Sequence, residues 1–401
     1  MLFPDAFGLI ALVSIVLQGL ELLTDVGIGA SIVQNKRGED PAFLNTAWTI
    51  HVIRGVGIFI CACLIAYPMG VFYGEPELIS IIAVMSVTGL ISGFNSMAVL
   101  LASRKLWVGR ATVMALAIRA ASICVMVVWA YLSPTVWVFV GGNIVSAILT
   151  AILSHMIFPW WRMKFQWDAQ AAREIVRFGK WMLLTSALAF FASQIDRLTL
   201  AKLVPLTLVG IYSIGFMWAM LPQQVVQSWM GRVFFPLAAE AFRNSDGNRA
   251  RLKLYRRRML WLSALGIALF GGLITPAYRL LYTPVYWQAT EFLQIILFGV
   301  LIRVLDEPYR AYNLALGQPK FTSIGAAGSI LIFAVVLNPL YVQYSAHGIA
   351  MAYSISQLGM LVVSIYGVRK TGLADLITDT VAVLACLGVW GGLYFATNGI
   401  V

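Results

Sequence analysis

The chain has 401 residues, of which 60% are hydrophobic and only 11% charged, and its mean hydropathy is +0.85. Soluble domains carry about 25% charged residues, so this composition excludes that class. Apolar runs of about 20 residues recur along the whole length, and each can cross a bilayer. The net charge of +11 lies mainly in short loops between these runs, as membrane topology requires, which argues against nucleic-acid binding. The sequence therefore predicts a multi-pass, all-α integral membrane protein.

In chain order, the hydropathy predicts twelve transmembrane helices. They cover residues 8–33, 42–69, 77–102, 108–132, 135–158, 178–200, 207–230, 259–281, 288–315, 321–341, 346–368 and 376–397. Alternate loops of this arrangement hold 21 of the 28 Lys and Arg residues. This one-sidedness places the basic loops in the cytoplasm. It also places Met1 on the external side, so we expect that a preceding helix is absent.

A weak internal repeat suggests two homologous halves. Residues 2–12 resemble residues 203–214, and residues 99–109 resemble residues 314–325. Many secondary transporters are built from such repeats, with the substrate site at the repeat interface. Residues 159–178 read as an amphipathic interfacial helix, either a linker between the halves or an ordinary surface helix. We expect an N-terminal bundle over 1–158, the linker helix over 159–178, a C-terminal bundle over 179–370 and an additional transmembrane helix over 371–401.

Charged side chains inside the predicted spans are the main functional signal, because charge at membrane depth is costly and normally faces a bundle interior or a wet cavity. Arginine stays charged when buried, and its planar guanidinium binds phosphate oxygens bidentately. The sequence therefore predicts a pocket for a phosphate-bearing anion. Its candidate ligands are Arg54, Arg119, Arg303 and Arg310.

Each candidate also has a structural alternative. Arg303 and Arg310 share one helical face with two acidic residues and could form a neutral ladder with them. Arg54 and Arg119 could instead pair with an acidic residue of the first span. The acidic residues of the first and ninth spans are also candidates for ion coupling or gating. An acid–base pair near the external end of the sixth span joins them. This set is Glu21, Asp25, Asp196, Arg197, Asp306 and Glu307.

The sequence predicts no catalytic, metal or cofactor site. The four cysteines lie within apolar spans, the three histidines are scattered, and no Gly-rich Lys-Ser/Thr phosphate loop occurs. His51 shares a helical face with Arg54, and we interpret it as a hydrogen-bonded interior residue in preference to a proton relay. These features predict a transporter and not an enzyme.

Three segments resemble a known family. LFPDAFGLIALVSIVLQGLELLTDVGIGASIVQNK (residues 2–36) is similar to the second-helix region of bacterial oligosaccharide flippases. These form the polysaccharide transporter branch of the multidrug/oligosaccharidyl-lipid/polysaccharide exporter superfamily. SQIDRLTLAKLVPLTLVGIYSIGFMWAMLPQQVVQSWMGRVFFPLAAE (residues 193–240) resembles the seventh and eighth helices, with an Asp-Arg pair, a Gly-hydrophobic-Tyr-Ser and a Phe-Pro ending in order. LALGQPKF (residues 314–321) resembles the exit of the tenth helix.

The resemblance implies two pseudo-symmetric helical bundles around a central cavity in the bacterial inner membrane. It implies alternating-access flipping of polyprenyl-pyrophosphate-linked oligosaccharide for O-antigen, capsule or exopolysaccharide assembly, with membrane lipids and polysaccharide-assembly proteins as partners. The family has one more helix before LFPDAFG, so the first family helix is expected to be absent here. One alternative is a drug/cation antiporter of the same superfamily. A membrane polysaccharide polymerase or ligase is less supported, because it would need a large periplasmic loop.

Overall fold

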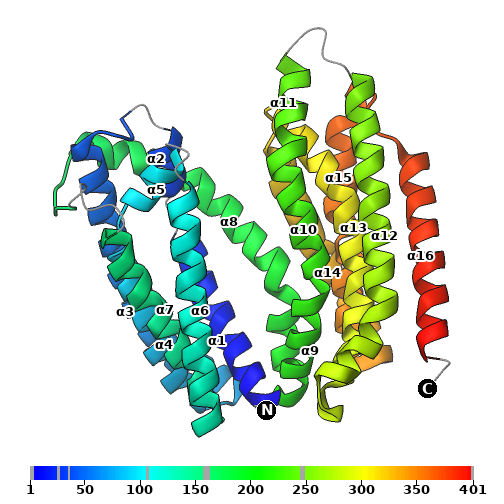
Figure 1. The fold of residues 1–401 in the computed structure, drawn as a ribbon, viewed down its shortest axis with the longest axis horizontal. Helices are drawn as coiled ribbons and strands as arrows, with labels where there is room; N and C mark the ends of the chain where they lie inside the picture. The colour runs from blue at the N-terminus through cyan, green and yellow to red at the C-terminus, as the bar shows by residue number, and fades with distance from the viewer. Residues whose placement is uncertain are drawn as a thin grey trace. The chain divides into compact units, whose positions relative to one another are not determined.

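The computed structural model describes residues 4–24, 28–34, 37–104, 108–156, 163–243 and 249–398, and every regular element within these ranges is helical (Figure 1). The chain divides into two compact units, Met1–Phe190 and Phe191–Val401. Among the described residues, nine helices are long and apolar enough to cross a membrane. The prediction of an all-α membrane protein is confirmed.

Unit 1 is a bundle of transmembrane helices with two short helices. Its elements are α1 (Pro4–Leu23), α2 (Ile28–Gln34), α3 (Pro41–Tyr73), α4 (Glu77–Gly93), α5 (Ala98–Arg104), α6 (Val108–Leu132), α7 (Trp137–Met156) and the first part of α8 (Ala169–Leu203). Helix α3 begins where the Asp40 side chain accepts a hydrogen bond from the Ala42 amide at 3.1 Å, and it ends at Gly74, whose φ of 73° suits glycine. The α3–α4, α6–α7 and α4–α7 pairs pack most extensively.

Glycines bring α3 and α4 into close contact. A Cβ atom at Gly55 would lie 2.9 Å from the carbonyl oxygen of Gly89 and 2.9 Å from the Cα atom of Gly93. Without side chains at these positions the two backbones can approach, which is how small residues favour helix association in lipid. This contact fixes the position of α3, the helix that carries His51 and Arg54.

Unit 2 is built around α13. Its elements are the rest of α8, α9 (Leu206–Ala219), α10 (Leu221–Trp229), the π-helical segment η1 (Met230–Phe234), α11 (Phe235–Arg243), α12 (Arg249–Leu281), η2 (Pro284–Tyr286), α13 (Ala289–Ala315), α14 (Lys320–Ser356), α15 (Leu358–Val368), η3 (Arg369–Thr371) and α16 (Leu376–Asn398). Helix α13 packs against α9, α11, α12, α14 and α15, and most of its side chains are buried. Helices α12 and α16 run side by side (Figure 1) and pack along each other.

A bend within α14 separates two membrane crossings, the second of which continues into α15. Ser345 has a φ of 51°, which is strained for a residue with a side chain. A Cβ atom at nearby Gly348 would lie 2.1 Å from the Leu340 carbonyl oxygen, so the chain folds back tightly there. The candidate span Lys320–Val368 therefore corresponds to the two predicted spans 321–341 and 346–368. Dividing this candidate turns the nine candidate spans into ten crossings. Helices α4 and α8 correspond to the predicted spans 77–102 and 178–200, so the described helices account for all twelve predicted crossings.

The structure differs from the expected boundaries at several places. The predicted span 8–33 ends at Leu23, and the span 77–102 is divided into α4 and α5. In the linker, residues 163–168 form no regular secondary structure, and residues 157–162 lie outside the described part. Helix α8 runs without a break through position 179, where the C-terminal bundle is expected to begin. The two compact units of the structure meet within this helix, between Phe190 and Phe191. Helix α16 packs on α12 as part of unit 2 instead of forming a separate element.

Candidate functional site

Arg54 contacts the end of α1. It is half-buried on α3, its Nε donates to the Thr24 hydroxyl oxygen at 3.2 Å, and its Nη2 donates to the Glu21 carbonyl oxygen at 2.6 Å. A cation is favourable at a helix C-terminus, where carbonyl groups lack partners within the helix. Glu21 therefore partners Arg54 through its backbone, while its side chain is exposed. Asp25, the other predicted partner, lies outside the described residues.

His51 lies on α3 near Arg54 and is half-buried. Its Nε2 lies 3.1 Å from the Ser92 carbonyl oxygen of α4, within hydrogen-bonding distance. This contact agrees with the predicted role of a hydrogen-bonded interior residue, and it joins the same two helices as the glycine contact described above.

Arg119 lies near the middle of α6 and is exposed. The described residues provide it with neither a hydrogen bond nor an ion pair. Hydrocarbon solvates a guanidinium very poorly, so a charged side chain at this depth favours contact with water or with an anion. Arg119 is thus the predicted ligand in unit 1 that has no bonded partner among the described residues.

In unit 2, α8 and α9 form a buried acid–tyrosine pair. Asp196 is fully buried, and the Tyr212 hydroxyl donates to its Oδ2 at 2.5 Å. The other carboxylate oxygen, Oδ1, has no hydrogen-bond partner among the described residues. Beside it, the half-buried Arg197 guanidinium lies 4.2 Å from the centre of the Phe216 ring, and its Nη2 donates to the Ser193 carbonyl at 3.4 Å.

Arg303 of α13 belongs to the same polar cluster. Its Nη1 donates to the Gln357 side-chain oxygen at 3.3 Å, and Arg303 and Arg197 both interact electrostatically with Tyr353. The Tyr353 ring packs edge-on against Phe216 at 5.4 Å. The sequence predicts Arg303 as a substrate ligand and Arg197 as an ion-coupling or gating residue. The structure brings both half-buried guanidinium groups close to the rings of Phe216 and Tyr353.

The charged face of α13 is divided between two environments. Arg310 forms an ion pair with Glu307 at 2.5 Å, and the Gln227 side chain of α10 donates to the other Glu307 oxygen at 3.0 Å. Arg303 instead points to the polar cluster. Asp306 is buried, and its Oδ1 has no hydrogen-bond partner in the described part of the chain. Of the predicted ion pairs along this face, the structure forms the one between Arg310 and Glu307. Arg303 has no ion pair with a carboxylate among the described residues.

A buried charge network at one end of unit 2 was not predicted from the sequence. Arg256 of α12 is 2% exposed, and its Nη2 donates to the Tyr309 hydroxyl at 2.6 Å and to the Asp379 carboxylate of α16. Tyr309 also donates to Asp379. The predicted spans 207–230 and 259–281 put Arg256 in the loop between them. Its spacing from Leu252, Met259 and Leu260 on one buried helical face is the signal that could have identified it.

An apolar groove lies between α10 and α12. It has a volume of about 450 Å³, and its lining consists almost entirely of hydrophobic side chains with one serine. Its residues include Pro222, Val225, Trp229, Leu262 and Phe270. Such a surface suits a lipid chain and offers little to a charged group.

Residues 1–281 match the family described as polysaccharide biosynthesis protein. The teichuronic acid biosynthesis protein TuaB of Bacillus subtilis (strain 168) is 19% identical over 340 residues, covering 84% of this chain and 69% of TuaB. The lipopolysaccharide biosynthesis protein WzxC of Escherichia coli (strain K12) is 23% identical over 269 residues, covering 67% of this chain and 53% of WzxC.

Solved transporter structures share the fold. An inward-facing multidrug resistance MATE family transporter of the MOP superfamily matches with a TM-score of 0.76 at 15% identity, over 92% of each chain. The lipid II flippase MurJ in an inward closed conformation matches with a TM-score of 0.65 at 11% identity, over 98% of this chain and 92% of MurJ. The match over residues 1–281 covers most of the sequence, and the chain belongs to the polysaccharide biosynthesis protein family.

Proposed function

We propose that this protein is a flippase of the bacterial inner membrane. Its substrate is a polyprenyl-pyrophosphate-linked oligosaccharide destined for a surface polysaccharide. The observation that carries the proposal is membership of the polysaccharide biosynthesis family over residues 1–281, with relatives named for teichuronic acid and lipopolysaccharide synthesis. Half-buried arginines within the spans give this family assignment a chemical basis, because a diphosphate needs cationic partners when it leaves water.

The four predicted arginines differ in whether their guanidinium groups already have a bonded partner. Arg119 has no bonded partner in the described part of the chain, and the side chains that hydrogen-bond to Arg303, Gln357 and Tyr353, are both neutral. Arg54 holds the end of α1, and Arg310 is balanced by Glu307. We therefore assign diphosphate contact to Arg303 in unit 2, with Arg197 as an addition from the same cluster. Arg119 is the corresponding candidate in unit 1. Arg54 and Arg310 support the surrounding helices.

The two buried aspartates are candidates for ion coupling. Asp196 and Asp306 each have a carboxylate oxygen without a hydrogen-bond partner among the described residues. Burying such an oxygen is costly unless it is protonated or binds a cation. Occupation of these oxygens by a proton or a cation would link the ion gradient to rearrangement of α8 and α13. The apolar groove between α10 and α12 would accommodate part of the polyprenyl chain.

A drug/cation antiporter is the alternative, supported by the match to the MATE fold. That fold is shared with a flippase, so it does not discriminate. The half-buried guanidinium groups favour an anionic substrate, because they would repel a cation. We expect this chain to move its substrate across the membrane without transforming it.

A deletion strain tests the proposal. Cells that lack the protein should accumulate the lipid-linked repeat unit on the cytoplasmic face and lose the surface polysaccharide, and a plasmid copy should restore both. Unchanged polysaccharide with no accumulated intermediate would refute the physiological role. Expression in a drug-sensitive strain tests the alternative, and we expect no change in resistance to cationic compounds.

A further inference from the structure

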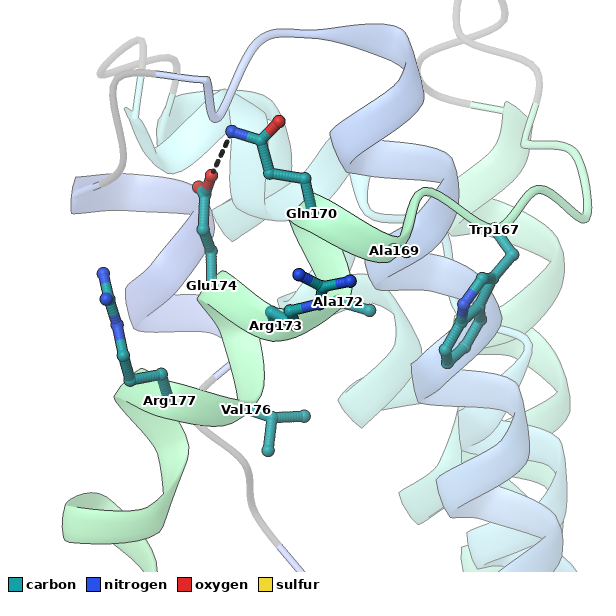
Figure 2. Close-up of a pocket in the computed structure, with 8 residues that line it drawn as sticks. All are labelled: Trp167, Ala169, Gln170, Ala172, Arg173, Glu174, Val176 and Arg177. Carbon is teal, nitrogen blue, oxygen red and sulfur yellow. Dashed lines mark hydrogen bonds between the residues drawn. The ribbon is translucent and has the colours of Figure 1, made fainter.

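A pocket of about 910 Å³ lies at the start of α8, within unit 1 (Figure 2). Its lining includes Trp167 just before the helix and two arginines, Arg173 and Arg177, on successive helical turns. Figure 2 also shows the hydrogen bond between Gln170 and Glu174, at 3.3 Å. None of these residues belongs to the site described above.

The segment that leads into this pocket is held on α3 by hydrogen bonds. The Gln166 amide donates to the Thr49 hydroxyl oxygen at 3.2 Å, and the Gln166 side chain accepts from Asn45 at 3.0 Å. The Asp168 amide donates to the Thr46 hydroxyl oxygen at 2.9 Å. These contacts fix Trp167, which lies between two bonded residues, so the pocket has a defined wall instead of a loose loop.

Arg37 neutralises the acidic side of the pocket. Its guanidinium forms ion pairs with Asp40 at 2.9 Å, with Asp168 at 2.8 Å and with Glu174 at 3.7 Å. Glu174 is the acidic residue among the described lining, and it is therefore engaged from outside the pocket. Consequently it does not form an ion pair with Arg173 or Arg177 in the structure.

The two lining arginines are left without a bonded counter-ion. Arg173 and Arg177 are exposed, four residues apart on one helical face, and neither makes a hydrogen bond or an ion pair with a described residue. Like charges at this spacing destabilise a helix by a few tenths of a kcal/mol, and an anion placed between them would remove that cost. The two positive charges therefore lack a counter-ion among the described residues.

The surrounding side chains place the pocket at the membrane surface. Trp167 is 61% exposed and Val176 is 54% exposed, although both are apolar enough to bury. Tryptophan concentrates at the headgroup level of bilayers. The one-sided distribution of Lys and Arg assigns this side of the protein to the cytoplasm, whose leaflet carries anionic lipids.

We propose that this pocket binds the phosphodiester headgroup of an anionic phospholipid from the cytoplasmic leaflet. Arg173 and Arg177 hold the phosphate oxygens by charge-assisted hydrogen bonds. Trp167 and Val176 contact the region where the acyl chains begin. The site is separate from the substrate path and does not rest on the proposed transport function, since a lipid can occupy it whether or not substrate is moved.

Lipid binding to the purified full chain tests the proposal. Protein in a neutral detergent is titrated with phosphatidylglycerol or phosphatidylcholine, and bound lipid is counted by native mass spectrometry. Wild type should bind phosphatidylglycerol more tightly, by about tenfold or more for two arginines near the surface. The double variant Arg173→Gln/Arg177→Gln should lose most of this preference.

A matched variant controls for overall charge. Arg257 and Arg258 of α12 are also exposed and lie near the start of the candidate span Leu252–Leu281, so Arg257→Gln/Arg258→Gln removes the same charge elsewhere and should keep the preference. Equal losses in both double variants, or no loss in either, would overturn the site. Displacement of phosphatidylglycerol by equimolar inorganic pyrophosphate would assign the pocket to a soluble anion and overturn the lipid proposal. Equal thermal unfolding midpoints among the variants confirm that folding is unchanged.

Discussion

Removing one charge from the buried Arg256 network should destabilise unit 2 severely. Arg256→Met leaves the Asp379 carboxylate, whose side chain is 9% exposed, with Tyr309 as its main partner. An unpaired buried charge of this kind costs about 3–5 kcal/mol. Asp379→Leu should cost a similar amount, because it leaves the Arg256 guanidinium, 2% exposed, without its counter-ion.

The double variant Arg256→Met/Asp379→Leu should be much less destabilised than the sum of the single variants. Only the Tyr309 hydroxyl then loses its strong partners, at a cost of about 1–3 kcal/mol. Reversible unfolding of the purified protein in mixed micelles measures all four members of this double-mutant cycle. Arg257→Met is the control, and as a change to an exposed neighbour it should stay within about 0.5 kcal/mol of wild type. Additive single effects would refute the assignment of a coupled pair.

Two further predictions concern unit 1. Gly55→Val should lower the free energy of unfolding by about 1–3 kcal/mol or more, because its side chain would meet the backbone of α4. Gly57→Val should be tolerated, because no heavy atom lies within 4 Å of its Cβ position. The same unfolding assay compares the two variants, and equal stability would contradict the close contact between α3 and α4. The Arg37 guanidinium lowers the pKa of Asp168, so this ion pair stabilises the fold at neutral pH and its contribution is lost as the pH falls through the lowered pKa, below about 4. The unfolding temperature of Asp168→Asn should therefore be lower than that of wild type at pH 7 and should converge with it in acid, and a constant difference would contradict this account.

The helical crossings were predictable because their signal is local. The predicted span 42–69 corresponds to α3, whose limits follow from Pro41 at its start and Gly74 at its end. The break after Gly93 was not predictable from hydropathy, since apolar residues continue on both sides of it. The turn there exists because helix α4 packs against α3 and α7, which is tertiary information.

The candidate arginines could be identified from sequence, but their partners could not. Depth in the membrane marks Arg54, Arg119 and Arg303 without showing which of them is already bonded. The partner of Arg54 is a backbone carbonyl, which any residue provides and no motif reveals. Arg256 was hidden in a run of basic residues, where only the helical phase separates a buried position from exposed neighbours.

Flipping by the purified protein tests the central claim most directly. The protein is reconstituted in vesicles with a fluorescent polyprenyl-diphosphate sugar, and movement between leaflets is followed for wild type, Arg119→Ala, Arg303→Ala and the control Arg257→Ala. A charge-assisted hydrogen bond contributes about 1.5–3 kcal/mol, so Arg119→Ala and Arg303→Ala should each slow flipping by about tenfold or more while the control flips at the wild-type rate. Unchanged rates in both site variants, with wild type active, would contradict the claim that these guanidinium groups bind the diphosphate.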